Sequence, residues 1–324
     1  MTATKNKSLY EVPILFLIYK NPEVTHTTFE AIRKIQPKKL FIAADGPKKN
    51  AKNEAHECNL TRDIIKNIDW KCDVKTRFLK KNLGLKMAVS SAITWFFSHV
   101  DEGIILEYDC LPNDHFFKFC QAMLIRYRHD RDIFSISGSN FQNGLQRGDG
   151  DYYYSNFFGC WGWATWKRSW DLWQPNLPDY DIFVRENQIN NFLLSNKTRR
   201  KYINELNNIV TGRNKTTWAF CFEYAQLRNS SLSIVPNKNL ISNIGFNSYA
   251  THSKDSTHPL ANLPSQNLTT FKKPTFKIAN HLADEIQISL SFYKNFRRKF
   301  IDNFKKIGVF FIPLKILIYL KNKF

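Results

Sequence analysis

Two acidic residues follow directly on an apolar run in the first half of the chain. Residues 103–106 read Gly-Ile-Ile-Leu, and Glu107 and Asp109 come immediately after them. The run predicts a buried strand, and residues two apart on an extended chain face the same side, so both carboxylates can point to one spot. Such a pair suits a hard divalent cation, Mn²⁺ or Mg²⁺, and that cation suits a diphosphate. The alternative is an acid that caps the next helix or pairs with a surface lysine.

Asp45 is a third acid at the end of a predicted strand. It follows the apolar run at 40–44 and precedes Gly46. The carboxyl ends of parallel strands meet at one edge of a sheet, so we expect Asp45 near Glu107 and Asp109. There it would accept hydrogen bonds from a base or a ribose, although an Asp-Gly pair alone more often marks a turn.

A basic segment lies between these two predicted strand ends. Lys80, Lys81 and Lys86 surround the tripeptide Asn82-Leu83-Gly84. The three ammonium groups could face phosphate groups, and a solvated basic loop explains each lysine equally well when it is taken singly.

Aromatic residues dominate the stretch that begins near residue 151. A helix over 164–173 would place most of its Trp residues on one face, which is typical of a packed core. Trp161 and Trp163 are separated by Gly162, a residue that permits close backbone approach. These two rings are predicted to line a site, because sugars dock their apolar faces on aromatic rings. A core beneath the site is the alternative.

Glu223 lies among aromatic residues in a helix predicted for 218–228. If its carboxylate is buried there, its pKa is raised, as a general base requires. An exposed acid that pairs with Arg228 is the equally favoured alternative. His252 stands in a later loop, where it could bind a metal or a phosphate, although a lone His is more often structural.

Strands and helices alternate along the first half of the chain, which predicts an α/β fold with a mostly parallel sheet and helices on both faces. Neither a Gly-x-Gly-x-x-Gly motif nor a Walker loop follows the first strand, which excludes the common dinucleotide and P-loop sites. Strands are expected at 12–19, 40–44, 71–79, 103–106, 133–137 and 233–236, and helices at 25–35, 48–68, 85–98, 116–127, 185–194 and 198–210.

The composition fits a large intracellular domain with an anionic partner. The 324 residues are 43% hydrophobic, which is enough for a sizeable core, and the net charge of +19 favours a nucleotide, a nucleic acid or an anionic membrane. None of the six Cys residues forms a Cys-x-x-Cys pair, so a zinc site is not expected and a reducing cytoplasm is. No signal peptide is visible at the start.

The C-terminal segment 286–324 reads as a basic amphipathic helix. Phe residues recur in it at helical spacing, and its apolar run at 307–320 is too short to span a bilayer. We expect it to attach peripherally to an anionic membrane; a helix docked on the core is the alternative. The predicted domains are 1–285, with a nucleotide-binding half at about 9–140 and an acceptor half at about 141–285, and the tail 286–324.

Several motifs, taken in order between residues 12 and 252, resemble the GT-A glycosyltransferases. Within them, the chain is similar to bacterial family 2 enzymes that carry a hemolysin-activation-like name. The resemblance is carried by Asp45-Gly46-Pro47, by Asn82-Leu83-Gly84, by the acidic motif at 105–112, by Trp161-Gly162-Trp163-Ala164-Thr165-Trp166, by 239–245 and by Ala250-Thr251-His252.

The resemblance implies roles for residues at matching positions. By position it implies nucleoside binding by Asp45 and metal binding by Asp109, with Glu107 beside it and His252 near the metal and the diphosphate. Together with the residue-level arguments above, the predicted nucleotide-binding residues are Asp45, Gly46, Asn82, Lys86, Glu107 and Tyr108, the metal ligands are Asp109 and His252, and the acceptor-binding residues are Trp161, Gly162 and Trp163. The chain departs from the pattern twice: Tyr108 stands where relatives usually have Asp, and Ala219 stands where they commonly carry an acid. Glu223 is therefore the substitute general base, with Asp151, Asp149 and Asp181 in reserve.

The expected activity is transfer of a sugar from a nucleotide diphosphate sugar, most simply a UDP-sugar, to an acceptor hydroxyl. Inversion and a need for Mn²⁺ or Mg²⁺ follow from the resemblance. A glycan or glycolipid acceptor in lipopolysaccharide or capsule synthesis, at the inner face of the cell membrane, would fit the basic tail. The alternatives are a sugar-phosphate nucleotidyltransferase, which usually has a Gly-rich basic loop where this chain has residues 19–22, and a nucleic-acid-binding protein. Nucleic acid is not expected as a partner, because acids occupy the strand ends.

Overall fold

The computed structural model describes residues 9–246 and 260–292 of the chain. Residues up to Ile288 belong to one compact unit, and a second unit, Ser289–Phe324, begins inside the last described helix, α9 (His281–Ser291). His252 and the part of the predicted tail beyond residue 292 lie outside the described residues. Within the described ranges, no helix combines the length and the apolar character that crossing a bilayer requires. The domain boundary expected at residue 285 stays a prediction.

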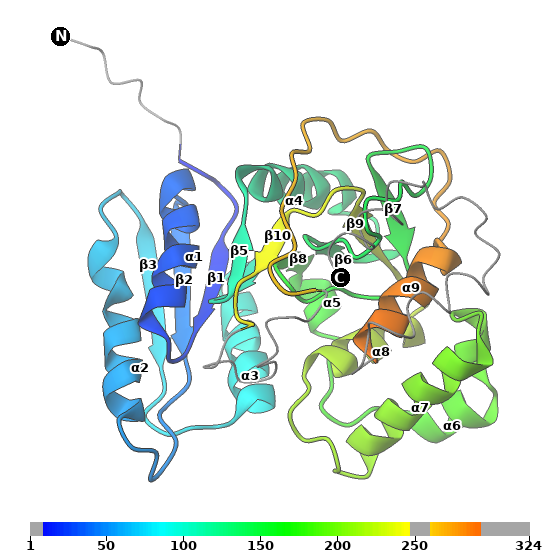
Figure 1. Ribbon diagram of the computed structural model, residues 1–324, viewed down its shortest axis with the longest axis horizontal. Coiled ribbons are helices and arrows are strands. Elements are labelled where there is room, and N and C mark those ends of the chain that lie inside the picture. Colours follow the sequence, from blue (N-terminus) through cyan, green and yellow to red (C-terminus); the bar gives the residue numbers. More distant parts are fainter. Residues whose placement is uncertain (1–8, 247–259, 293–324) are drawn as a thin grey trace, which may run out of the picture. The chain divides into compact units, whose positions relative to one another are not determined.

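An eight-stranded sheet forms the centre of the first unit (Figure 1), in the order β3-β2-β1-β4-β8-β6-β9-β7. Neighbouring strands β3, β2, β1 and β4 are parallel, β6 is parallel to β9, and β8 and β7 run against their neighbours. The predicted, mostly parallel α/β sheet is therefore confirmed. The strands are β1 Ile14–Ile18, β2 Lys39–Ala44, β3 Asp73–Phe78, β4 Glu102–Glu107, β6 Ile133–Ser137, β7 Tyr152–Ser155, β8 Trp163–Trp166 and β9 Leu232–Pro236.

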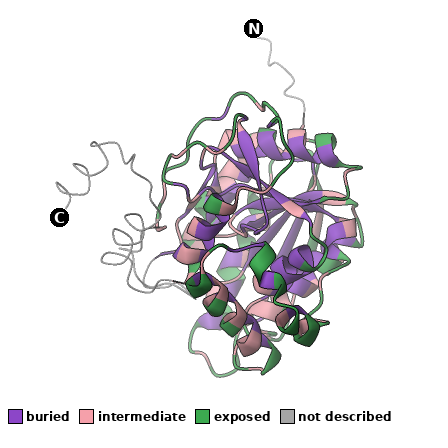
Figure 2. Cartoon of the chain, turned by 90° about the vertical axis from the view of Figure 1, so that its right-hand side faces the viewer, coloured by how far each residue is buried: buried purple, intermediate pink, exposed green. Residues whose placement is uncertain are grey.

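Helices cover both faces of this sheet, because alternate residues of its strands face two separate cores. Along β1, Ile14 and Phe16 pack in a cluster with residues of α1 and α4, whereas Leu15 and Leu17 pack with α3 and α8. Figure 2 shows buried residues along the strands and exposed ones on the outer helix faces. The helices are α1 Pro22–Ile35, α2 Glu54–Arg62, η1 Asp63–Asn67, α3 Leu85–Phe97, α4 Asp114–Tyr127, α5 Lys167–Trp170, α6 Tyr180–Arg185, η2 Gln188–Asn191, α7 Asn196–Val210 and α8 Ala219–Arg228.

The helix predicted over 164–173 is wrong. Residues Trp163–Trp166 form strand β8, which pairs with β4 on one side and β6 on the other, and only the short helix α5 follows. Trp163 packs into one core and Trp166 into the other, so the aromatic spacing serves a strand with two buried faces. Pairing on both edges satisfies the backbone of β8, and this outweighs the helical spacing of the Trp residues.

A small antiparallel pair, which the sequence did not indicate, extends the end of β4. Strand β5 (Cys110–Pro112) pairs with β10 (Ile241–Asn243), and Ser242 lies opposite Leu111. Beyond it, the Ile244 N–H donates to the Asp109 carbonyl at 2.8 Å. A segment more than a hundred residues away in sequence is thereby fixed beside the acidic motif.

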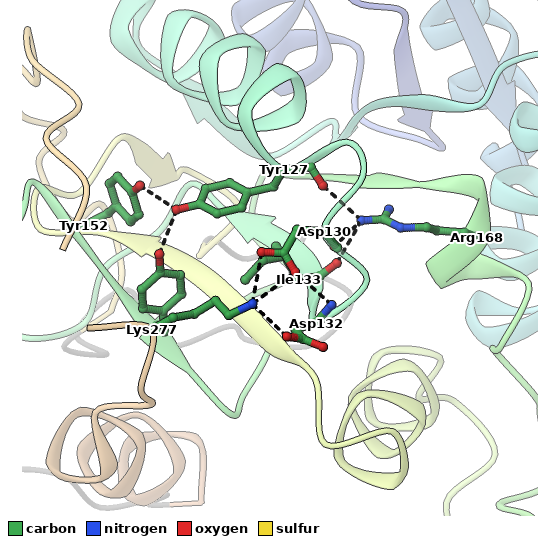
Figure 3. A network of polar contacts seen from close by, with 8 residues as sticks. Tyr127, Asp130, Asp132, Ile133, Tyr152, Arg168 and Lys277 are labelled. Carbon is green, nitrogen blue, oxygen red and sulfur yellow. Dashed lines mark hydrogen bonds and ion pairs between the residues drawn. The ribbon is translucent and has the colours of Figure 1, made fainter. Parts of the chain in front are cut away.

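The turn between α4 and β6 is fixed by polar contacts (Figure 3). The Lys277 ammonium pairs with Asp130 at 3.1 Å and with Asp132 at 2.7 Å. The Arg168 guanidinium donates to backbone carbonyls of the same turn, including that of Asp130 at 2.9 Å. At the end of α4, the Tyr127 hydroxyl hydrogen-bonds those of Tyr152 and Tyr154, each at 2.7 Å. The ion pairs attach the segment around Lys277 to the turn between α4 and β6, and the Asn280 N–H, which donates to the Tyr154 carbonyl at 2.8 Å, attaches the same segment to β7.

Candidate functional site

A cavity of about 690 Å³ lies at the carboxyl ends of β1, β2 and β4. The first turns of α3 and α8 and the segment after β10 complete its wall. Six of the residues singled out from the sequence line it: Asp45, Asn82, Glu107, Tyr108, Asp109 and Trp161. The predicted convergence of three acid-bearing positions on one edge of the sheet is therefore present in the fold.

Glu107 and Asp109 are brought together by the end of β4. Glu107 is the last residue of that strand, and the Tyr108 N–H donates to the Leu17 carbonyl of β1 at 2.9 Å, which extends the pairing by one residue. Burial raises the pKa of both carboxyls, and the charge of Asp109 raises that of Glu107 further. The Cys110 S–H, 3.7 Å from Asp109 Oδ1, partly offsets the shift at Asp109.

This pair fits a divalent cation by its chemistry. Among the described residues, no Lys or Arg forms an ion pair with Glu107 or Asp109, so these two adjacent acids share a poorly solvated space without a direct cationic partner. Oxygen ligands of this kind suit Mn²⁺ and Mg²⁺. Within the described ranges, no three His, Cys, Asp or Glu side chains cluster as a complete metal site. A cation held here would thus take its other ligands from water or from substrate oxygens, as Mg²⁺ commonly does.

Gly245 forms the wall opposite the Asp109 carboxylate. A β-carbon at position 245 would stand 2.8 Å from Asp109 Cβ and closer still to Oδ2. The Asn243 side chain accepts the Gly245 N–H at 2.9 Å, which fixes the backbone at this point. The sequence marked Gly245 only as part of a motif; its contact with Asp109 depends on the β5–β10 pairing and was missed.

Asp45 organises the loop that starts α3. Its Oδ1 accepts the N–H groups of Gly46 at 2.8 Å and Leu83 at 2.9 Å, and its Oδ2 accepts the Gly84 N–H at 3.1 Å. A carboxylate has about four acceptor positions, so these three bonds leave Oδ2 with capacity toward the cavity. The expected contact of Asp45 with a nucleoside stays a prediction.

Asn82 lines the cavity, whereas two other predicted nucleotide-binding residues do not. The Lys86 ammonium donates to the Pro175 carbonyl at 2.7 Å and so connects α3 to the segment before α6. Gly46 packs against the backbone of Lys81, where a β-carbon would stand 2.6 Å from its nitrogen. Gly46 therefore permits a close approach of two loops, and Lys86 joins a helix to a loop.

Of the predicted acceptor residues, Trp161 alone lines the cavity. Its ring meets Phe141 and Phe246 edge-on, with centroids 5.2 and 5.7 Å away. Trp163 has no exposed surface and stacks on Trp218 at 5.7 Å, so it belongs to the core and not to the cavity wall. Gly162 has φ +61°, and a β-carbon there would stand 2.8 Å from Ile241 Cγ1.

Glu223 is buried, which is one of the two alternatives that the sequence left open, and it lies outside the cavity wall. It accepts the Tyr202 hydroxyl at 2.8 Å and the Phe158 N–H at 3.3 Å. Burial raises the pKa of Glu223 to about 8, although both hydrogen bonds oppose the shift. Of the two alternatives, the structure has the buried carboxylate and not the exposed partner of Arg228, because Glu223 is buried and Arg228 pairs with Asp179.

The other candidate bases also lie elsewhere. The Asp151 carboxylate accepts the Lys272 N–H at 2.6 Å, Asp149 accepts the Thr275 N–H at 3.0 Å, and Asp181 is an exposed residue of α6. Among the described residues, the carboxylates in the cavity wall are those of Asp45, Glu107 and Asp109. Catalysis by Glu223 or Asp151 stays a prediction.

Sequence reasoning missed several residues of the wall. Arg77 reaches it from β3, and Lys48 reaches it from the loop after β2. Arg77 could have been found, because it lies on a predicted strand and pairs in register with Ala43, close to the end of β2. Asn214 and Thr217, which precede α8, gave no signal, because their position depends on how α7 and α8 pack.

No protein-family model matches the chain, and no curated protein matches its sequence. Three solved structures with partial similarity are residues 1–349 of TarS from S. aureus, the mannosyltransferase PcManGT from Pyrobaculum calidifontis in complex with GDP-Man and Mn²⁺, and a cytidylyltransferase from Leptospira borgpetersenii. Their identities are 10%, 9% and 15%, and their TM-scores are 0.39, 0.38 and 0.32. The matches cover 69%, 67% and 51% of this chain, and 58%, 70% and 63% of those chains. This chain therefore spans little more than half of the TarS fragment.

Proposed function

We propose that this protein transfers a glycosyl group from a nucleotide diphosphate sugar to an acceptor hydroxyl. The observation that carries the proposal is the pair Glu107 and Asp109, two carboxylates without a described cationic partner at the end of a central strand. The cavity beside them, about 690 Å³, falls in the usual range for small-ligand sites. A divalent cation would supply the missing counter-charge, and a diphosphate bound to that cation would occupy part of the space.

We assign a role to each group of site residues. Asp109 and Glu107 would hold Mn²⁺ or Mg²⁺, with His252 as a further predicted ligand, and the cation would neutralise charge on the departing diphosphate. The loop shaped by Asp45 and Asn82 supports binding of the nucleoside. Trp161 offers an aromatic surface to the acceptor sugar. Inversion at the transferred carbon is expected from the resemblance alone.

The donor, the acceptor and the location are proposed from the sequence. A UDP-sugar donor and a glycan or glycolipid acceptor at the inner face of the cell membrane would fit the net charge of +19 and the basic tail. Helix α9 carries Asp284 and Glu285, which are buried against the core, so a fair test of the tail must keep that helix. Removing residues 293–324 should release the protein from anionic vesicles; unchanged binding would contradict the membrane role.

Hydrolysis and transfer assays test the proposed activity. UDP-, GDP- and CDP-sugars are incubated with the full chain, with Mn²⁺ or with a chelator, and the released nucleotide is identified. We expect metal-dependent release of a nucleoside diphosphate that Asp109→Asn abolishes. Release of pyrophosphate from a nucleoside triphosphate and a sugar phosphate would indicate a nucleotidyltransferase instead. Turnover that survives both the chelator and Asp109→Asn would contradict the metal role.

A further inference from the structure

Glu54 is a buried acid just behind the cavity wall. It is the first residue of α2 and is 4% exposed, and it is not part of the wall itself. Its carboxylate accepts the Tyr19 hydroxyl, the Lys20 ammonium at 2.9 Å and the Lys48 N–H at 2.8 Å. A buried carboxylate with donors from three residues is fixed in one orientation.

The partners of Glu54 belong to loops that do form the wall. Tyr19 follows β1 and Lys48 follows β2, and both line the cavity. Asn82, in the loop before α3, donates to the Tyr19 hydroxyl at 3.0 Å and to the Gly46 carbonyl at 2.8 Å. One carboxylate thus connects, directly or through Tyr19, three loops that arrive from different strands.

The charge of Glu54 decides the direction of these bonds. Burial alone would raise its pKa, but the donors outweigh that effect and hold the pKa at about 2. An ionised carboxylate only accepts, so the Tyr19 hydroxyl must donate to it and offer its lone pairs to the Asn82 amide. Asn82 therefore donates to Tyr19, and Tyr19 donates to Glu54. These two hydrogen bonds fix the position of the Tyr19 side chain at the cavity wall.

We propose that Glu54 is a positioning residue for the nucleotide-binding end of the cavity. It does not touch the ligand; it holds Tyr19, Lys48 and Asn82 where the ligand meets them. The proposal rests on the proposed function, since the ligand is taken to be the nucleotide part of the donor. Loss of Glu54 should weaken nucleotide binding in the ground state and leave the chemical step largely unchanged, so that KM rises while kcat is nearly constant.

Binding of UDP and GDP, each with Mn²⁺, to full-length variants tests this role. Glu54→Gln removes the charge while nearly keeping the shape, and we expect it to raise Kd about tenfold, which corresponds to about 1.4 kcal/mol. Tyr19→Phe should act through the same bond, so the double variant should bind no more weakly than Glu54→Gln alone. Glu54→Asp keeps the charge and should restore part of the affinity.

Glu285→Gln is a matched control. Glu285, on helix α9, is also 4% exposed. Its carboxylate accepts the N–H groups of Leu194 and Ser195 and the hydroxyl of Thr198. This variant should lose stability to a similar extent and keep the Kd of the parent. If Glu54→Gln lowers Tm as Glu285→Gln does and leaves Kd unchanged, Glu54 is only a structural residue and the proposal is overturned.

Amide hydrogen exchange separates this proposal from the proposed function. In Glu54→Gln, exchange should accelerate in the loops around Tyr19, Lys48 and Asn82 but not at α9, and Glu285→Gln should show the reverse. Faster exchange in those loops, together with no nucleotide binding by the parent, would refute the proposed function while the holding role of Glu54 stands. Unchanged exchange there would overturn the role of Glu54 whatever the ligand is.

Discussion

Gly245 packs directly on the side chain of Asp109, and the space between them is too small for a β-carbon. A methyl group at position 245 would stand 2.8 Å from Asp109 Cβ, which is shorter than van der Waals contact. The hydrogen bond from the Ile244 N–H to the Asp109 carbonyl holds the two backbones together, so neither can move away freely. The orientation of the Asp109 carboxylate is thus set by a residue far away in the sequence.

Replacing Gly245 with Ala should therefore displace the Asp109 carboxylate and weaken cation binding. We expect about tenfold weaker binding of Mn²⁺, which is about 1.4 kcal/mol, with a native far-UV circular dichroism spectrum. The measurement is the rise in Tm with Mn²⁺ concentration for the parent and the variant. Equal rises in both proteins would show that Gly245 does not control the site.

Asp109→Asn should have opposite effects with and without the cation. Without it, removal of one of two adjacent carboxylates relieves their repulsion, so the free energy of unfolding should rise by about 1 kcal/mol near neutral pH. With Mn²⁺, the variant should lose the increase in Tm that the parent shows. Asp179→Asn, which removes an exposed acid paired with Arg228, is the control and should keep that increase. A variant that is destabilised without metal would contradict the account of an uncompensated pair.

The sequence predicted the strand ends that carry Asp45, Glu107 and Asp109, because each end follows a short apolar run, and such a run can be recognised from neighbouring residues alone. Strand β6 was predicted with its observed bounds for the same reason. The β5–β10 pair could not be predicted, since it joins segments that are far apart and only three residues long. Glu54 was overlooked because its partners come from other loops and no local pattern marks it.

The Trp pair shows a second limit of local patterns. Residues two apart on an extended chain face the same side, which favours a common site for Trp161 and Trp163. Gly162 has φ +61°, so the chain turns between them before β8 begins at Trp163. Trp161 therefore faces the cavity and Trp163 the core. The glycine was visible in the sequence, but its dihedral angle was not.

Alanine substitutions should separate these two Trp residues. Trp163→Ala empties a fully buried position and should lower the free energy of unfolding by about 3–5 kcal/mol. Trp161→Ala removes a partly buried ring from the cavity wall and should cost less stability, while it lowers the rate of transfer to a saccharide acceptor. Urea unfolding and transfer assays on both variants check this. Similar losses of stability in the two would mean that Trp161 is also a core residue.

Glu223 should make the protein less stable as the pH rises toward 8. Burial raises its pKa to about 8 in the folded chain, against 4.5 for an ordinary glutamate. Between these values the unfolded chain has released this proton and the folded chain still holds it. Unfolding therefore releases a proton, and the free energy of unfolding falls by about 1.4 kcal/mol per pH unit. Below pH 4.5 both states are protonated and the contribution is constant.

Glu223→Gln tests this dependence, because glutamine cannot ionise and can still accept the Tyr202 hydroxyl. Two other groups face Glu223: Tyr202 on α7, whose pKa burial raises still higher, and Asp284 on α9, whose pKa burial raises to about 6. Since Asp284 gives a slope of the same sign at lower pH, the window for the test is about pH 6 to 8. Glu107, whose pKa burial raises to about 8, contributes there in both proteins, so its effect cancels when the variant is compared with the parent. Across that window, urea unfolding should show a falling free energy for the parent and a flatter one for the variant. Parallel curves would mean that Glu223 is already ionised in the folded chain. An ionised carboxylate in this buried position would need a cationic partner, and the described residues do not supply one.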